Sequence, residues 1–134
     1  MTRSVRRRDD QGSISAEVMI ALPAVMFTIL VCMQLCLLFF AQSVALAAAQ
    51  QGVRAARADG ASRTAGAGVA RSYAERTAGG FLHSISTSSA GDATSVRVTV
   101  QGRALSLVPF LPSIRVSEEA AGAVERFTTP GQVP

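Results

Sequence analysis

The sequence predicts an α+β protein that is anchored in a membrane, and three observations support this fold class. An apolar block runs from Val18 to Ala41, an alanine-rich segment follows as far as residue 80, and valine alternates with polar residues at positions 96–101. We expect a long N-terminal transmembrane helix that extends outside the bilayer, a second short helix, and a small C-terminal antiparallel sheet. At 134 residues, the chain holds at most one small domain.

The apolar block is the transmembrane candidate. It has 24 residues, and the three that are not plainly apolar are Pro23, Thr28 and Gln34. A helix of this length spans about 36 Å at ~1.5 Å per residue, which is enough to cross a hydrocarbon core of about 30 Å. A buried helix of a soluble domain is the alternative, but the 93 residues after the block could not easily cover it on all sides. We therefore predict a transmembrane helix at residues 13–41.

We make separate predictions for four residues inside this helix. Pro23 removes one backbone donor and is expected to kink the helix axis. Cys32 and Cys36 lie four residues apart with no histidine or carboxylate nearby to complete a metal site. We expect them to be packing residues, with an interchain disulfide as the less favoured alternative. Gln34 is expected to form a hydrogen bond across a helix interface.

The charges suggest an orientation. Four of the 13 arginines lie in residues 1–12, before the apolar block. We expect these residues to be a basic cytoplasmic leader, because positively charged flanks stay on the cytoplasmic side of a membrane. The C-terminal region is then extracytoplasmic. No arginine-rich stripe interleaved with aromatic residues is present, so we do not expect a nucleic-acid partner.

The segment from residue 42 to residue 82 is rich in alanine and arginine and is predicted to be helical and extracytoplasmic. We expect the first helix to end near Asp59 and a second helix to run from Ser62 to Thr77. Glycines interrupt the helical preference at positions 52, 60, 66 and 68. The packing seam expected for the second helix consists of apolar residues spaced four apart, with one threonine: Val69, Tyr73, Thr77 and Phe81.

A polar loop is predicted at residues 83–93 and a small antiparallel β region of two or three strands at residues 94–127. The alternation at 96–101 indicates a half-buried strand, Gly102 is a candidate bulge position, and Ala104 to Val108 could continue the pairing. A turn at Pro109 and Pro112 separates it from a second alternating segment, residues 113–117. GAVERF at 122–127 is a candidate further strand, and residues 128–134 are expected to form a flexible tail.

The sequence offers little of the chemistry that an enzyme needs. His83 is the only histidine, and no ordered acid and nucleophile accompany it. GAGVAR at residues 66–71 begins like a dinucleotide fingerprint but lacks its third glycine. Outside the membrane block, we find no cluster of metal ligands. We therefore expect a structural protein with no catalytic residue, metal or cofactor.

Glu17 stands directly before the apolar block, and the next charge is Arg54. An acid in the first turn of a helix complements the macrodipole by ~0.3–1 kcal/mol, which is one explanation for it. Three targeting interpretations are open. A secretory signal peptide cut near Ala47 would need a shorter apolar region, and an uncleaved anchor leaves Glu17 unexplained. The third interpretation is a hydrophilic leader that is removed after Gly12.

The third interpretation coincides with a family resemblance. Gly12-Ser13, then Ala16-Glu17, then Ala21-Leu22-Pro23 resembles the TadE-like proteins, minor pseudopilins of the tight-adherence (Flp/type IVb) pilus system, in their actinobacterial form. The Ala/Arg-rich stretch after the membrane block and the β-rich tail extend the resemblance. Members of the family often carry an aromatic residue after the glutamate, where this chain has Val18.

The resemblance implies a pilin-like fold and a maturation step. A prepilin peptidase would cut after Gly12, and the new amine of Ser13 on one subunit would pair with Glu17 of its neighbour during assembly. The implied partners are that peptidase, other pseudopilins and the major pilin, the inner-membrane assembly platform with its cytoplasmic ATPase, and the lipid bilayer. The implied location is the bacterial cytoplasmic membrane, crossed once, with possible incorporation into a pilus. An uncleaved single-pass scaffold and a secreted binding module remain the alternatives.

Overall fold

The computed structural model describes residues 10–58, 62–108 and 110–124, with side chains from Glu17 onward except that of Arg63. It contains two helices and three strands, in the order α1 (Asp10–Arg57), α2 (Arg63–Ala78), β1 (Leu82–Gly91), β2 (Ser95–Ala104) and β3 (Ile114–Ala123). The predicted arrangement of elements is confirmed, because a long apolar helix is followed by a short helix and an antiparallel sheet; the membrane anchoring stays a prediction.

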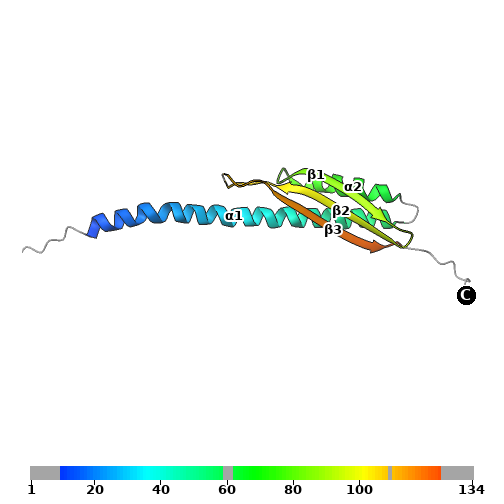
Figure 1. The fold of residues 1–134 in the computed structure, drawn as a ribbon, viewed down its shortest axis with the longest axis horizontal. Coiled ribbons are helices and arrows are strands. Elements are labelled where there is room, and N and C mark those ends of the chain that lie inside the picture. The colour runs from blue at the N-terminus through cyan, green and yellow to red at the C-terminus, as the bar shows by residue number, and fades with distance from the viewer. Residues whose placement is uncertain (1–9, 59–61, 109, 125–134) are drawn as a thin grey trace, which may run out of the picture.

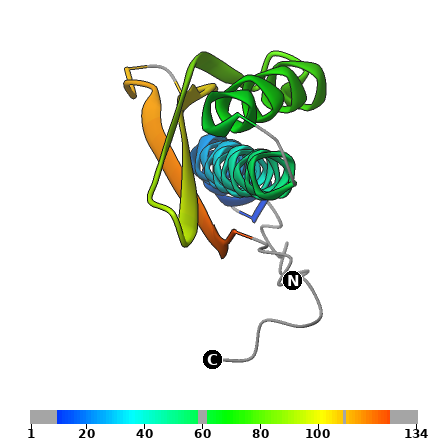
Figure 2. The same ribbon diagram turned by 90° about the vertical axis from the view of Figure 1, so that its right-hand side faces the viewer.

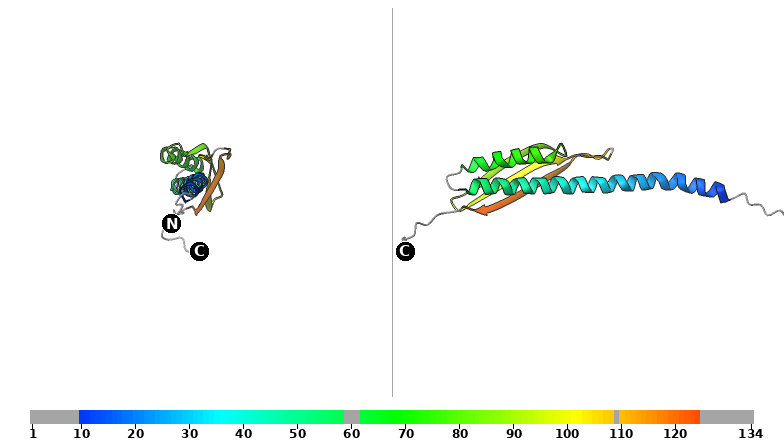
Figure 3. Two further views of the ribbon diagram at one scale, coloured as in Figure 1. Left: turned by 90° about the vertical axis from the view of Figure 1, so that its left-hand side faces the viewer. Right: turned by 180° about the vertical axis from the view of Figure 1, so that it is seen from behind.

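The molecule is a rod with a domain at one end (Figure 1). Helix α1 runs its whole length, and α2 and the sheet gather around the C-terminal half of α1. Seen along its axis, α1 has α2 on one side and the sheet on another (Figure 2). The N-terminal half of α1 projects away from all of them, which the view from behind also shows (Figure 3). The described chain is therefore a long stem that carries a small head of two layers, with α1 and α2 side by side on one face of the sheet.

Helix α1 has 48 residues and continues through Pro23 without a break. It is about 72 Å long at ~1.5 Å per residue, more than twice the thickness of a hydrocarbon core. It begins at Asp10, so the expected boundary between leader and helix at Gly12 and Ser13 falls inside the helix. It ends at Arg57, close to the expected end at Asp59, which lies outside the described residues. The kink expected at Pro23 stays a prediction.

Helices α1 and α2 cross through glycine and alanine. A Cβ atom on Gly52 would lie 2.7 Å from the carbonyl oxygen of Gly66, and one on Gly66 would lie 2.7 Å from that of Gly52. These two glycines lie inside the helices, as the predicted ranges have them, and they let the two backbones approach each other closely. Gly68, in contrast, faces open space.

The packing seam of α2 also differs from the prediction. Its inward face consists of Ala70, Ala74 and Ala78, all buried, together with Gly66. Val69 is 39% exposed, Thr77 is exposed, and only Tyr73 of the expected seam in this helix packs partly against the core. The close approach at the glycines leaves no room for larger side chains between the helices, so the small residues one position along the chain take the seam.

The sheet has the order β1-β2-β3, with antiparallel pairing throughout. Val96, Val98 and Val100 of the central strand are buried against the helices, as the alternation predicts. The polar loop predicted at 83–93 is wrong, because most of it forms β1. A segment rich in serine and threonine gives little local indication of a strand. In the structure, Thr87 of β1 donates a hydrogen bond of 3.0 Å to the carbonyl of Ala67 in α2.

Irregularities of the sheet lie close to the predicted places. The pairing of β1 with β2 shifts between His83 and Ser86, directly opposite Gly102. The bulge expected at Gly102 thus lies on the neighbouring strand, β1. Gly102 lies opposite the bulge, and its lack of a side chain leaves room for Leu82. Strand β2 ends at Ala104, so Ala104 to Val108 does not extend the pairing. Residues 125–127 of the candidate strand GAVERF and the expected tail lie outside the described residues.

Asp92 closes the turn between β1 and β2. Its Oδ1 atom accepts hydrogen bonds of 2.7 Å from the hydroxyl of Thr94, from the backbone N–H of Thr94 and from the N–H of Ser95. These bonds favour the charged carboxylate and hold the pKa of Asp92 well below its usual range, with the hydroxyl of Thr94 as the largest cause. The turn thereby fixes the distal end of the sheet, opposite the stem.

Candidate functional site

The N-terminal end of α1 holds the predicted processing and pairing residues. Gly12 and Ser13 are helical in their backbone, and their side chains are outside the described part. Glu17 is exposed to its surroundings. Because Ser13 and Glu17 are four residues apart in a helix, they lie on the same face. The structure therefore places all three in the backbone of one helical segment at the N-terminal end of α1, the end that projects away from the domain (Figure 1).

From Val18 to Met33, α1 exposes apolar side chains all around. The exposed large residues of this stretch are Val18, Met19, Ile20, Leu22, Val25, Met26, Phe27, Ile29, Val31 and Met33. A helix that is apolar on every side is stable in lipid or in a protein core. By length and composition, the helix from Glu17 to Arg57 qualifies as one that crosses a membrane. We call the part from Val18 to Met33 the free segment, because none of its side chains is buried and Gln34 is the first buried residue of α1 whose side chain is described.

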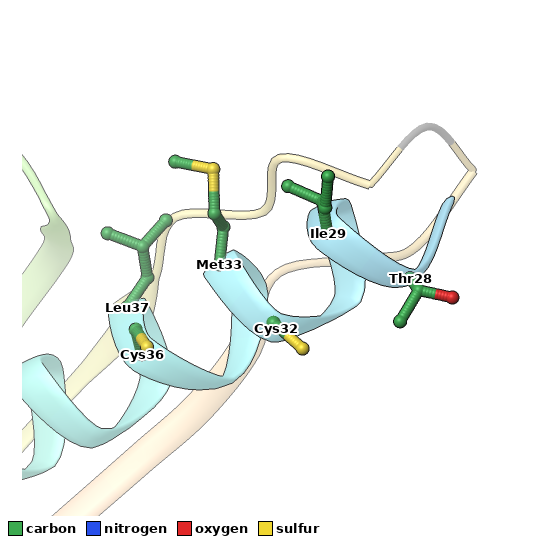
Figure 4. A pocket seen from close by; sticks show the side chains of 6 residues that line it. All are labelled: Thr28, Ile29, Cys32, Met33, Cys36 and Leu37. Atoms are coloured by element: carbon green, nitrogen blue, oxygen red, sulfur yellow. The ribbon is translucent and has the colours of Figure 1, made fainter. Parts of the chain in front are cut away.

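Cys32 and Cys36 are free and exposed at the end of this segment. Figure 4 shows them beside Thr28 on α1, with Ile29, Met33 and Leu37 pointing to another side of the helix. All six line one shallow apolar groove on the helix surface. Within the described residues, no group of three histidine, cysteine or acidic side chains is placed to hold a metal.

Other candidate polar groups are also dispersed. His83 lies exposed on β1, paired with Arg103 across the sheet. Arg71 and Glu75 form the expected surface pair one turn apart on α2, with 2.8 Å between Nε and Oε1. Among the residues that the structure describes, neither His83 nor the Arg71–Glu75 pair belongs to a cluster that contains a nucleophile and a base.

Gln34 is the one buried polar side chain in the described part of the molecule, at 5% exposure. Its Oε1 accepts a hydrogen bond of 2.7 Å from the N–H of Leu107, and its Nε2 donates one of 3.2 Å to the carbonyl of Leu105. Both partners belong to the β2–β3 loop, which we define as residues 105–112. The expected bond across a helix interface is thus made to this chain's own loop.

The β2–β3 loop is the feature that sequence reasoning missed. It runs from the end of β2 back along α1, toward the free segment (Figures 1 and 4). Val108 and Phe110 line an apolar groove together with four residues of α1: Pro23, Met26, Phe27 and Leu30. Its signal in the sequence is the apolar stretch LSLVPFLP, in which leucine, valine and phenylalanine flank Pro109.

At the base of the loop, two arginines lie side by side. Arg103 of β2 is directly opposite Arg115 of β3, and both are exposed on the face of the sheet that points away from the helices. With Ser84, Ser86 and Gln101, they line a polar pocket. Like charges in directly opposite positions destabilise a sheet, so the stability of the sheet does not explain why two arginines lie here.

Comparison with known proteins found one similarity, in the N-terminal part of the chain. Residues 12–54 match the family model described as TadE-like protein. The matched residues lie within α1, from the first turn to just before its end. No match was found among curated proteins or among solved structures. The match concerns the helix and not α2 or the sheet.

Proposed function

We propose that this chain, which matches the TadE-like family model over residues 12–54, is a pseudopilin: a membrane-anchored structural subunit that joins or primes a tight-adherence pilus after cleavage behind Gly12. The observation that carries the proposal is the free segment. An exposed apolar helix preceded by one carboxylate suits a subunit whose helix leaves lipid only to pack against other such helices.

Glu17 has a defined task in this proposal. A carboxylate near the edge of hydrocarbon is costly, and at mid-helix an Asp costs roughly 2.5–3.5 kcal/mol on insertion scales. Cleavage after Gly12 creates an amine at Ser13, and pairing that amine with Glu17 of a neighbour neutralises both charges as helices bundle. The position of Gly12 in the first turn of α1 favours access, since helix ends fray.

The alternatives fit the structure less well. A secreted module cut near Ala47 would lose Ala41, Val44 and Ala45, which are buried in the core of the domain. An uncleaved anchor keeps the core but gives Glu17 no partner amine. The proposed partners are therefore a prepilin peptidase, other pseudopilins and the major pilin, and the membrane assembly platform, in a cytoplasmic membrane crossed once with the domain outside.

The first test is the N-terminal residue of protein recovered from membranes. We expect Ser13, because the leader is removed. Met1 or Thr2 would instead identify an uncleaved anchor, and a residue near Ala48 would exclude both the anchor and the pseudopilin.

The second part of this test concerns Glu17. We expect Glu17→Gln to insert into membranes as the unmodified protein does, yet to be absent from sheared pili, because it cannot neutralise the Ser13 amine. Glu75→Gln is the matched control, since Glu75 is an exposed acid on α2. Normal recovery of Glu17→Gln in pili would show that the pairing account is wrong.

A further inference from the structure

The free segment alone is too short to cross a membrane. Val18 to Met33 is 16 residues, or about 24 Å at ~1.5 Å per residue, whereas the hydrocarbon core measures about 30 Å. Beyond Gln34, the uncovered side of α1 continues with Leu35, Phe39 and Phe40, which are 50%, 67% and 42% exposed. If Glu17 lies at one edge of the hydrocarbon core, the opposite edge of that core lies at the first turns of α1 that the domain covers.

The β2–β3 loop lies within that depth. Gln34 is 17 residues from Glu17, about 26 Å along the helix, and it holds Leu105 and Leu107. The rest of the loop extends from there toward Pro23 and Phe27. Its Phe110 is fully exposed, at 106%, with a φ of 70° that points to a tightly constrained turn. Leu107 and Leu111 are 39% and 43% exposed.

Several backbone positions of the loop expose no free N–H group. Pro109 and Pro112 have no N–H group. The N–H of Leu105 is bonded to the carbonyl of Phe81, that of Leu107 to Gln34, and that of Leu111 to the carbonyl of Val108. Irregular backbone is tolerated at membrane depth when its polar groups are satisfied within the protein.

The arginine pair lies where a headgroup layer would be. Arg103 is two strand residues before Leu105, on the side away from the free segment, which puts it about 30 Å from Glu17 along α1. No described acidic side chain forms an ion pair with Arg103 or Arg115, whereas Arg97 at the other end of the same face is paired with Glu119 at 3.0 Å. The unneutralised charge of this face is therefore at its membrane-proximal end.

We propose that the β2–β3 loop is a second membrane contact: its apolar tip at Phe110 enters the hydrocarbon beside α1, while Arg103 and Arg115 bind the phosphates of anionic phospholipids. The occupant of this surface is the lipid bilayer. The inference rests on the proposed membrane anchoring of α1. It adds that the domain sits on the membrane in one fixed orientation before it enters any filament.

The experiment uses the absence of tryptophan from the chain. Full-length Phe110→Trp is reconstituted in vesicles of phosphatidylcholine and phosphatidylglycerol. We expect its fluorescence to be quenched by brominated acyl chains and protected from aqueous iodide. Phe27→Trp reports on α1 in the bilayer, and Ala90→Trp, at the distal end of β1, reports on the exposed part of the domain.

The outcomes separate the loop from the anchor. If Phe110→Trp is as accessible to iodide as Ala90→Trp while Phe27→Trp is quenched by lipid, the loop proposal is overturned and the anchor stands. If Phe27→Trp is also accessible to iodide, both are overturned. Protection of Phe110→Trp that disappears when the protein is diluted in lipid would assign the surface to a second copy of the chain, which also overturns the proposal.

The arginines are tested in the same Phe110→Trp background. We expect Arg103→Gln and Arg115→Gln each to lower the ratio of lipid-protected to iodide-accessible tryptophan about fivefold in vesicles with phosphatidylglycerol, and to have no such effect in phosphatidylcholine alone. Arg97→Gln is the control on the same face and should change neither ratio. Equal effects of Arg97→Gln and Arg103→Gln would overturn the role given to the pair.

Discussion

Gln34 shows how much one residue decides in this molecule. In the sequence, it is a single polar side chain within an apolar block, for which a neighbouring helix is a reasonable partner. In the structure, it satisfies one donor and one acceptor of a loop more than 70 residues away. A buried amide that is bonded at both its oxygen and its nitrogen fixes the orientation of the group it holds. Gln34 therefore determines where the domain begins along α1.

We expect Gln34→Leu to lower the free energy of unfolding by ~1–3 kcal/mol, because it leaves the N–H of Leu107 and the carbonyl of Leu105 without partners. The measurement is denaturant unfolding of the full chain in detergent, together with hydrogen exchange at the amide of Leu107. Gln50→Leu is the matched control, since Gln50 is exposed on the same helix, and it should change stability by less than ~0.5 kcal/mol. Equal losses for both variants would contradict the role of Gln34.

At the scale of elements, the contact between α1 and α2 shows that glycine has two opposite effects on a helix. It weakens a helix by ~1 kcal/mol relative to alanine, which is why a glycine-rich stretch favours an interruption. At Gly52 and Gly66 the missing side chain instead lets two backbones meet. The loss in helix propensity is offset by packing of the buried alanines on either side.

We expect Gly52→Ala to destabilise the protein by ~1–3 kcal/mol, because the added methyl group would meet a backbone carbonyl that cannot move aside easily. Gly68→Ala should stabilise it by up to ~1 kcal/mol, because that position faces open space and gains helix propensity. Thermal unfolding of both variants measures the difference in sign. Two stabilising substitutions would show that the helices do not cross at Gly52.

The whole molecule consists of a stem and a head with different surroundings. The free segment is apolar on all sides, whereas the outward face of the sheet carries serine, threonine, glutamine, arginine and glutamate. This contrast is what we expect of a stem in lipid and a head in water. The two free cysteines lie near the junction, on the stem.

We expect a charged maleimide added to intact cells to leave Cys32 and Cys36 unlabelled, because lipid surrounds them, and to label them after denaturation. In a variant without these cysteines, Ser88→Cys should be labelled in intact cells, since Ser88 is exposed on the domain that we place outside. Labelling of Cys32 or Cys36 without denaturation would contradict the lipid location of the stem. Labelling of Ser88→Cys after cell lysis alone would reverse the orientation.

The sequence by itself determined the features that depend on neighbours along the chain. The apolar block indicated α1, the alanine content indicated α2 within one residue of its ends, and the alternation of valines indicated β2. Gly12, Ser13 and Glu17 form a local pattern, so they too were found without the structure, although their processing and pairing stay predictions.

Only the tertiary structure decided the features that depend on distant contacts. Strand β1 is polar and exists because β2 and α2 supply its partners. Gly52 and Gly66 act as a contact because two helices cross there. The β2–β3 loop lies beside the stem because Gln34 holds it. Composition and periodicity report on residues a few positions apart, so they carry no information about which groups meet across 14, 20 or 70 residues.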